Sequence, residues 1–139
     1  MALICDTGPL LAAADRNEVD HEACATLLSE SVERLIVPAP VVVELDWLMT
    51  SRLEPAAFDA FLGSVENRFV LVEELTPPDY SRIRQLCRRY SDLALGFVDA
   101  AVVSIAERYG ETKLATLDRR HFGVIRPRHV RSFTLLPAG

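Results

Sequence analysis

The sequence predicts an α/β fold in three layers, α/β/α, with a mostly parallel sheet of four or five strands. Short apolar runs alternate along the chain with longer segments that have helical periodicity. These runs are continuously apolar, which is typical of strands that helices bury on both faces. A chain of 139 residues has the length of one domain with one core. We therefore expect residues 1–139 to form a single domain.

The strands are expected where the apolar runs lie, at residues 2–5, 35–37, 69–72, 114–117 and 132–136. The first run stops at Asp6 and the fourth stops at Asp118, so both strands end on a carboxylate. The last run is the weakest, and we expect it at an edge of the sheet.

The helices are expected between these runs, at residues 8–14, 21–31, 40–52, 55–67, 77–90 and 97–109. Several begin with proline, which fits the first turn of a helix. Asp20 is in place to cap the second helix, and Thr76 with Asp79 three residues later forms a capping pair for the fifth. Gly110 ends the sixth helix.

The composition excludes several classes of protein. The longest apolar run, residues 35–43, has nine residues and contains two prolines, so no membrane helix is expected. The first six residues lack the basic start of a signal peptide. Cys5, Cys24 and Cys87 lack the spacing of a metal site, and we expect them to be reduced. These features favour a cytoplasmic protein.

The charge differs strongly between the two parts of the chain. Residues 1–79 carry 15 acids and 4 bases, whereas residues 80–139 carry 5 acids and 11 bases. Of the 15 bases, 14 are arginine, the side chain that suits phosphate binding best. Such asymmetry is compatible with nucleic-acid contact. The arginine count has an ordinary alternative explanation in the base composition of the genome.

Two carboxylates directly follow predicted strands. Asp6 follows the first strand and Asp118 follows the fourth. In an open parallel sheet, the carboxyl ends of the strands form the ligand crevice. An aspartate at such a position also often caps the next helix, so neither residue is decisive alone.

Two further carboxylates lie on helix faces that should point at the core. Glu44 shares a face with Val41 and Leu45, and Asp99 shares a face with Val102. A buried carboxylate is unfavourable unless a cation or several donors meet it. The ordinary alternatives are that Glu44 reaches water from the edge of its face and that Asp99 compensates the helix dipole.

Four carboxylates at one end of the sheet cannot all stay ionised in a poor dielectric without cations. Oxygen ligands suit Mg²⁺ or Mn²⁺. His21, His121 and His129 do not form a zinc set, and no histidine or lysine in the motifs is placed to act as a separate general base. Such a site is typical of nucleases and phosphatases, in which metal ions activate water and stabilise the leaving oxygen.

Other enzymes of this fold class fit less well. A phosphatase with an aspartyl nucleophile needs Asp-x-Asp after the first strand, where this chain has Asp6-Thr7-Gly8. A receiver domain needs an aspartate after a central strand and a lysine near the end, but Lys113 begins its strand. Deoxyribonucleases and flap nucleases share the acidic chemistry but usually carry extra helical elements.

The motifs together resemble the PIN-domain family, and the whole chain resembles the VapC toxins of bacterial VapBC toxin–antitoxin pairs. The resemblance rests on Asp6-Thr7, on Glu44, and on the stretches 96–100 (Gly-Phe-Val-Asp-Ala) and 116–122 (Thr-Leu-Asp-Arg-Arg-His-Phe). Each motif is short, but their order and spacing are fairly specific. The departure is Gly8-Pro9, where the family more often has a small polar residue after Asp-Thr or Asp-Ser.

The resemblance implies a PIN-like fold and an endoribonuclease toxin that depends on Mg²⁺, with Mn²⁺ as a substitute, and cleaves structured RNA such as tRNA or rRNA. It also implies a homodimer, neutralisation by a VapB antitoxin and a bacterial cytoplasmic location. The alternative is a non-catalytic PIN-like module that binds RNA or protein. Carried over by motif, the residues that hold metal are Asp6, Glu44, Asp99 and Asp118. Thr116 matches a hydroxyl position that orients ligands or water, and Asp92 matches an acid whose role as a ligand is open.

The basic part of the chain then has a use. Arg119 and Arg120 follow Asp118 and are expected to contact substrate phosphates. Arginines of the fifth helix, at positions 82, 84, 88 and 89, are either further RNA contacts or solvated surface. Trp47 and Phe61 are apolar residues beyond the sheet-facing stripes, and they are candidates for the homodimer interface or for core packing.

Overall fold

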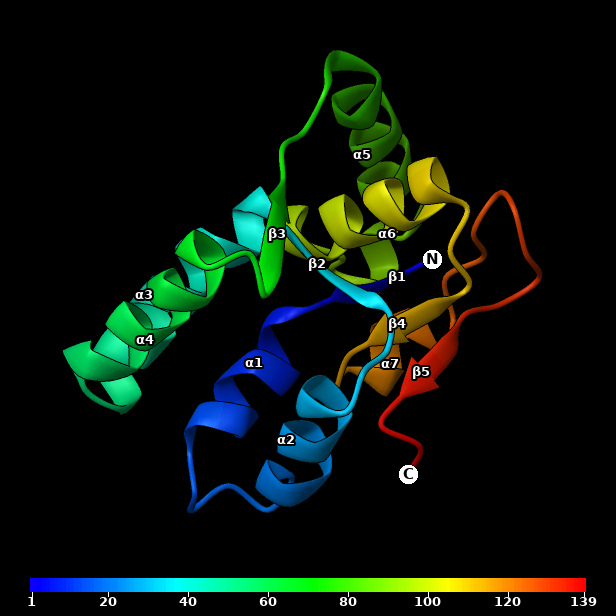
Figure 1. Cartoon of the computed structure of the whole chain (residues 1–139). Coiled ribbons are helices and arrows are strands. Elements are labelled where there is room, and N and C mark those ends of the chain that lie inside the picture. Colours follow the sequence, from blue (N-terminus) through cyan, green and yellow to red (C-terminus); the bar gives the residue numbers. More distant parts are fainter.

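A computed structural model describes residues 1–139 and contains one sheet of five strands (Figure 1). The strands are β1 (Ala2–Cys5), β2 (Arg34–Pro38), β3 (Val70–Glu73), β4 (Lys113–Ala115) and β5 (Thr134–Leu136). Their order is β3-β2-β1-β4-β5, and every neighbouring pair is parallel. The predicted parallel α/β class is confirmed, and the fifth strand lies at an edge as expected.

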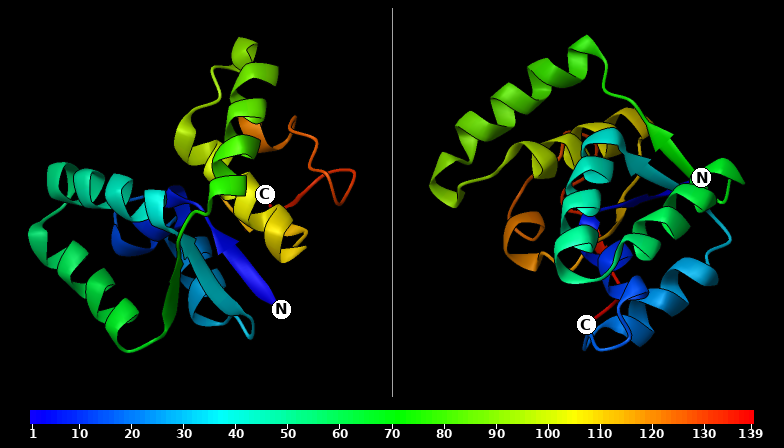
Figure 2. Two further views of the ribbon diagram at one scale, coloured as in Figure 1. Left: turned by 90° about the horizontal axis from the view of Figure 1, so that it is seen from above. Right: turned by 90° about the vertical axis from the view of Figure 1, so that its left-hand side faces the viewer.

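Helices cover both faces of this sheet. They are α1 (Thr7–Ala14), α2 (His21–Ser29), α3 (Ala39–Arg52), α4 (Pro55–Glu66), α5 (Pro77–Arg89), α6 (Phe97–Tyr109) and α7 (Arg119–Phe122), with the 3-10 helix η1 (Ser91–Leu93). Figure 2 shows α1 and α2 on one side of the sheet and α5 with α6 on the other, while α3 and α4 project as a hairpin. These layers are the predicted α/β/α arrangement, and no helix is long and apolar enough to span a membrane.

The element boundaries differ from the prediction in a few places. The second helix ends at Ser29 rather than at residue 31, and the fourth strand ends at Ala115 rather than at residue 117. The short elements η1 and α7 were not predicted, because one turn of helix has no apolar periodicity. The earlier end of β4 matters for the site, since Thr116 and Asp118 lie on a loop beyond the strand.

The helix ends largely follow the predicted chemistry. The Asp79 carboxylate accepts hydrogen bonds from the backbone N–H of Thr76 at 2.8 Å and from its hydroxyl at 2.9 Å. Gly110 ends α6 with φ of 68°, the left-handed conformation that glycine adopts without strain. Asp20 precedes α2 as expected, but its side chain makes no capping hydrogen bond.

The core lies between the central strands and α6. All four residues of β1 are buried, as are seven consecutive residues of α6, from Ala100 to Ala106. Each large aliphatic side chain buried here stabilises the fold by about 1.5–3 kcal/mol. This packing fixes the position of β1 and of α6, and therefore of the residues just beyond the strand and in the first turn of the helix.

Candidate metal-dependent nuclease site

The fold brings the predicted acids to one end of the sheet. Asp6 follows β1 directly, and Asp118 lies three residues beyond β4, the parallel neighbour of β1. Helix α3 starts directly after β2 and carries Glu44 in its second turn, and α6 carries Asp99 in its first turn. Helix α3 starts at the carboxyl end of β2, and α6 runs back to the start of β4, so the first turn of α6 lies at the carboxyl end of the sheet. The four side chains therefore share this edge.

Asp6 is the most buried of the acids, with 6% of its surface exposed. Its carboxylate accepts a hydrogen bond of 2.9 Å from the hydroxyl of Thr116, which is fully buried. Burial raises the pKa of Asp6 from 3.8 to about 6; the carboxylates of Asp99 and Glu44 add to this, and the Thr116 hydrogen bond opposes it. The sequence did not predict this contact between Thr116 and Asp6, and burial makes ionisation of Asp6 less favourable than in water.

Glu44 lies at the edge of the buried face of its helix. Val41 and Leu45 are fully buried, whereas Glu44 is half-buried. Its carboxylate accepts a hydrogen bond of 2.5 Å from the hydroxyl of Thr7. The sequence reasoning assigned no role to Thr7, although its hydroxyl next to Asp6 was a usable signal.

Asp99 and Asp118 converge with a residue that the prediction set aside. Asp99, Asp118 and His121 each contribute one atom that could bind a metal ion, and these three atoms all lie within 4.8 Å of one another. The His121 Nδ1 lies 2.6 Å from Asp118 Oδ2 and 3.9 Å from Asp99 Oδ2. No histidine was expected among the acids, and His121 lies there because α7 turns its ring back toward Asp118.

The charges of these residues are coupled. The pKa of Asp99 is raised by partial burial and by the nearby carboxylates of Asp118 and Glu44, while His121 opposes the shift. Asp99 is thus within electrostatic reach of Asp6, Glu44 and Asp118, and Asp6 is also within reach of Glu44. Carboxylates that repel one another at one edge of the sheet suit a hard divalent cation, because its positive charge would offset the repulsion.

Not every candidate joins this cluster. Asp92 is exposed on η1 and stands outside the Asp99 group. The Arg119 guanidinium donates to the Pro137 carbonyl at 2.7 Å, whereas Arg120 is exposed. Arg82 pairs with Glu107 at 2.8 Å, so the pairing makes it a poor candidate for RNA contact. Arg120 is exposed, as are Arg84, Arg88 and Arg89, so these arginines stay candidates for RNA contact.

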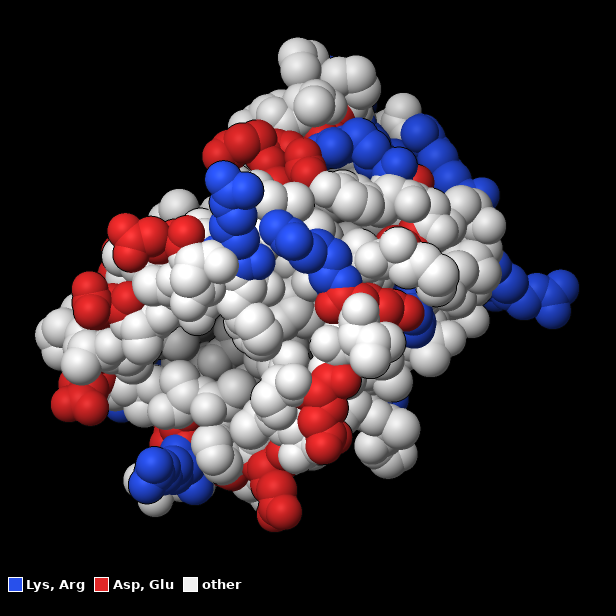
Figure 3. Space-filling model, viewed as in Figure 1, with Lys and Arg blue, Asp and Glu red and all other residues white.

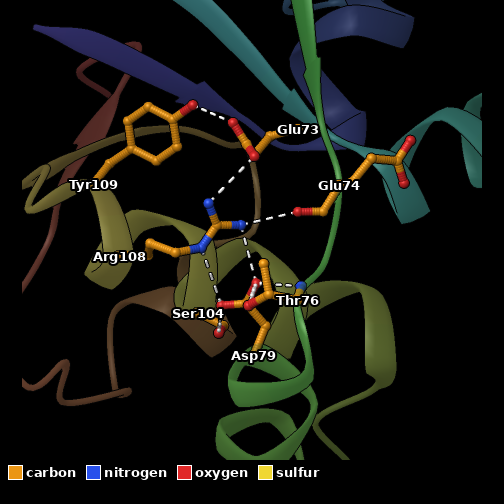
Figure 4. A network of polar contacts seen from close by, with 7 residues as sticks. All are labelled: Glu73, Glu74, Thr76, Asp79, Ser104, Arg108 and Tyr109. Atoms are coloured by element: carbon orange, nitrogen blue, oxygen red, sulfur yellow. Dashed lines mark hydrogen bonds and ion pairs between the residues drawn. The ribbon is translucent and has the colours of Figure 1, made fainter.

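Figure 3 shows one face of the molecule, on which acidic and basic side chains are interleaved. The basic part of the chain therefore forms no continuous basic surface on this face. Figure 4 shows one such set of pairs, which the sequence reasoning did not find. Arg108 of α6 donates to Asp79 at 3.0 Å and to Glu73 at 3.2 Å, and Ser104 donates to Asp79 at 3.0 Å. This network fastens α6, which carries Asp99, to the start of α5.

The largest groove, of 680 Å³, lies beside Glu44 and is mostly apolar. Its lining includes Trp47, Tyr80 and Phe97, with Trp47 67% exposed and the rings of Tyr80 and Phe97 stacked 6.1 Å apart. Phe61, the other candidate, is buried in the core, which was the alternative expected for it. Of the two candidates, only Trp47 remains available to a partner.

Comparison with known proteins agrees with this geometry. The PIN-domain family model matches residues 3–126, so the chain belongs to the PIN-domain family. The chain is 37% identical over 138 residues to Ribonuclease VapC26 of Mycobacterium tuberculosis, covering 97% of this chain and 100% of that protein. Within the family it is therefore a VapC-type ribonuclease, as the motifs indicated.

Solved structures share the fold at lower identity. The crystal structure of Mycobacterium tuberculosis VapC20, a toxin that cleaves the sarcin-ricin loop, matches with a TM-score of 0.81 at 19% identity, covering 93% of this chain and 98% of that one. FitAcB from Neisseria gonorrhoeae matches with a TM-score of 0.61 at 17% identity, covering 86% and 88% of the two chains. These matches support the PIN-like arrangement of the sheet and helices.

Proposed function

We propose that residues 1–139 act as one PIN domain, an endoribonuclease toxin that cleaves structured RNA such as tRNA or rRNA and depends on Mg²⁺, with Mn²⁺ as a substitute. The observation that carries the proposal is the convergence of four acids from four separate elements on one edge of the sheet. The proposed metal ligands are Asp6, Glu44, Asp99 and Asp118. Asp92 is exposed and stays a secondary candidate.

These carboxylates would hold a divalent cation, which would supply activation of water and stabilisation of the leaving oxygen of the phosphodiester. The chain itself orients the carboxylates. Thr116 holds Asp6 at 2.9 Å, and Thr7 holds Glu44 at 2.5 Å. Asp118 Oδ1 accepts the backbone N–H of His121 at 3.0 Å, and the Thr116 hydroxyl accepts the backbone N–H of Asp118 at 3.0 Å. One threonine thus links two of the acids, while Arg119 and Arg120 are proposed to meet the RNA backbone.

The proposed protein partners are a second copy of the chain and a VapB-type antitoxin. The apolar groove with its exposed Trp47 supports a protein contact beside the site. The VapC name of the relative supports the antitoxin. Light scattering at high concentration tests the homodimer, and a species of only 15.5 kDa would contradict it.

Asp99→Asn tests the activity. The amide keeps the shape of the side chain but removes one ligand charge, so the fold should survive while RNA cleavage falls by orders of magnitude. Cleavage of total bacterial RNA is measured with Mg²⁺ and with EDTA, and the exposed Asp59→Asn is the matched control. Expression of wild type alone should arrest growth, whereas Asp99→Asn should not. Equal cleavage by Asp99→Asn and wild type would show that the proposed metal role of Asp99 is wrong, whereas no cleavage by wild type with Mg²⁺ would favour a non-catalytic module.

A further inference from the structure

The ring of His121 lies between the acids and the backbone of another element. Its Nδ1 is 2.6 Å from Asp118 Oδ2, and its Nε2 is 2.8 Å from the carbonyl oxygen of Leu93 on η1. A carbonyl oxygen only accepts hydrogen bonds, so Nε2 must carry a proton and donate it to Leu93. Only Nδ1 is then free to offer a lone pair, and it faces Asp118 and Asp99.

This orientation is the one that metal-binding histidines adopt. A ligating histidine almost always donates its other ring N–H to a carbonyl or a carboxylate, which fixes the tautomer and the ring. The Leu93 carbonyl already does this for His121. The other ring nitrogen, Nδ1, lies 2.6 Å from Asp118 Oδ2, so a metal ion held by this carboxylate would also meet the imidazole.

We propose that His121 Nδ1, Asp99 and Asp118 form a mixed nitrogen–oxygen site that selects Mn²⁺, Co²⁺ or Zn²⁺ over Mg²⁺. The three donor atoms, one from each residue, all lie within 4.8 Å of one another, and all three side chains are partly buried. Imidazole suits transition metals, whereas Mg²⁺ prefers oxygen ligands and water. The proposal rests on the proposed function, because Asp99 and Asp118 belong to the nuclease site, and it adds a nitrogen ligand that raises the affinity for Mn²⁺, the ion expected to substitute for Mg²⁺ there.

The geometry allows this without rearrangement of the fold. The three residues come from the first turn of α6 and from the loop and helix after β4, both anchored in the core. The side-chain exposures of 18% for His121, 24% for Asp99 and 31% for Asp118 leave a path from solvent for an ion. Asp6 and Glu44 lie outside this group, so the other side of the acid cluster keeps oxygen donors only.

The test compares metal affinities of wild type, His121→Asn and His129→Asn. His129 bonds to the Glu111 carbonyl away from the acids, so its variant is the matched control. Binding of Co²⁺, Zn²⁺ and Mg²⁺ is measured by titration calorimetry, and Co²⁺ also by its visible absorption. We expect His121→Asn to lose about tenfold or more in Co²⁺ and Zn²⁺ affinity. Its Mg²⁺ affinity should change little, and His129→Asn should match wild type for every ion.

A second measurement uses the unaltered protein, so it does not depend on the folding of a variant. In histidine side-chain NMR, addition of Zn²⁺ should shift the Nδ1 resonance of His121 by tens of ppm. The resonances of the other two histidines should not change. If Mg²⁺ binds and RNA is cleaved but the His121 resonance stays in place, this proposal is overturned and the proposed function stands. If no divalent cation binds at the acids, both are overturned.

Discussion

Replacing Asp6 by asparagine should stabilise the metal-free protein, and the size of the effect follows from its burial. The pKa of Asp6 is raised from 3.8 to about 6, by burial first and then by Asp99 and Glu44. A shift of roughly two pKa units corresponds to about 3 kcal/mol between the two protonation states. For a chain of this size, that is about 10 °C in melting temperature.

The sign of the pH dependence follows from proton linkage. Because the folded-state pKa is raised, folding favours the protonated carboxyl, and that contribution is fully present below the unfolded-state value of 3.8. It is lost as the pH rises through about 6. Asparagine is neutral at every pH, and its amide oxygen still accepts the Thr116 hydrogen bond. The variant should therefore exceed wild type by about 3 kcal/mol at about pH 8, and by little at about pH 4.

The assay is urea unfolding at several pH values in EDTA, repeated with Mg²⁺. The exposed Asp59→Asn variant is the control and should follow wild type throughout. Mg²⁺ should stabilise wild type and so reduce the difference in stability between wild type and Asp6→Asn, because the bound cation offsets the repulsion between the carboxylates. Asp6→Asn should gain much less from Mg²⁺. An Asp6→Asn variant that is less stable than wild type at about pH 8 in EDTA, or a difference that ignores pH, would refute the reasoning.

Two further predictions concern the arginines. Arg108→Met leaves the buried Asp79 without its cation and should lower the free energy of unfolding in urea by about 2 kcal/mol. Adding Asp79→Asn should recover part of this loss. A single variant as stable as wild type would contradict the role of the network. Arg120→Ala should weaken RNA binding and reduce the slope of log affinity against log salt by about 1, without changing Mg²⁺ affinity. Arg119→Ala should weaken RNA binding less, because the Arg119 guanidinium is hydrogen-bonded to the Pro137 carbonyl. An unchanged slope for Arg120→Ala would show that Arg120 does not contact the RNA.

The network around Asp79 also shows how one residue can serve two elements. Burial alone would raise the pKa of Asp79, but hydrogen bonds from Arg108, Thr76 and Ser104 together lower it. The sequence predicted the local half of this, the capping pair with Thr76, because capping depends on a fixed spacing along one helix. Arg108 lies 29 residues away, and no spacing rule leads to it.

The sequence by itself determined the class of fold and predicted the four acids as candidate metal ligands. Continuous apolar runs indicate buried strands, parallel strands expose their carboxyl ends at one edge, and helical periodicity placed Glu44 and Asp99 toward the core. These rules are local or topological, so they hold without coordinates. Together with the order of the motifs, they also sufficed to recognise the PIN-domain family, whose model matches residues 3–126.

Only the tertiary structure decided which side chains hold the acids in place. The Thr7–Glu44 hydrogen bond spans 37 residues, Thr116–Asp6 spans 110, and the contact of His121 with the Leu93 carbonyl spans 28. It also decided that Trp47 is exposed while Phe61 is buried, although both had looked alike in the sequence. A hydrogen bond forms over about 3 Å, whereas the placement of a helix or loop depends on the packing of the whole core. Contacts at that scale between distant elements are fixed by packing and not by spacing along the chain.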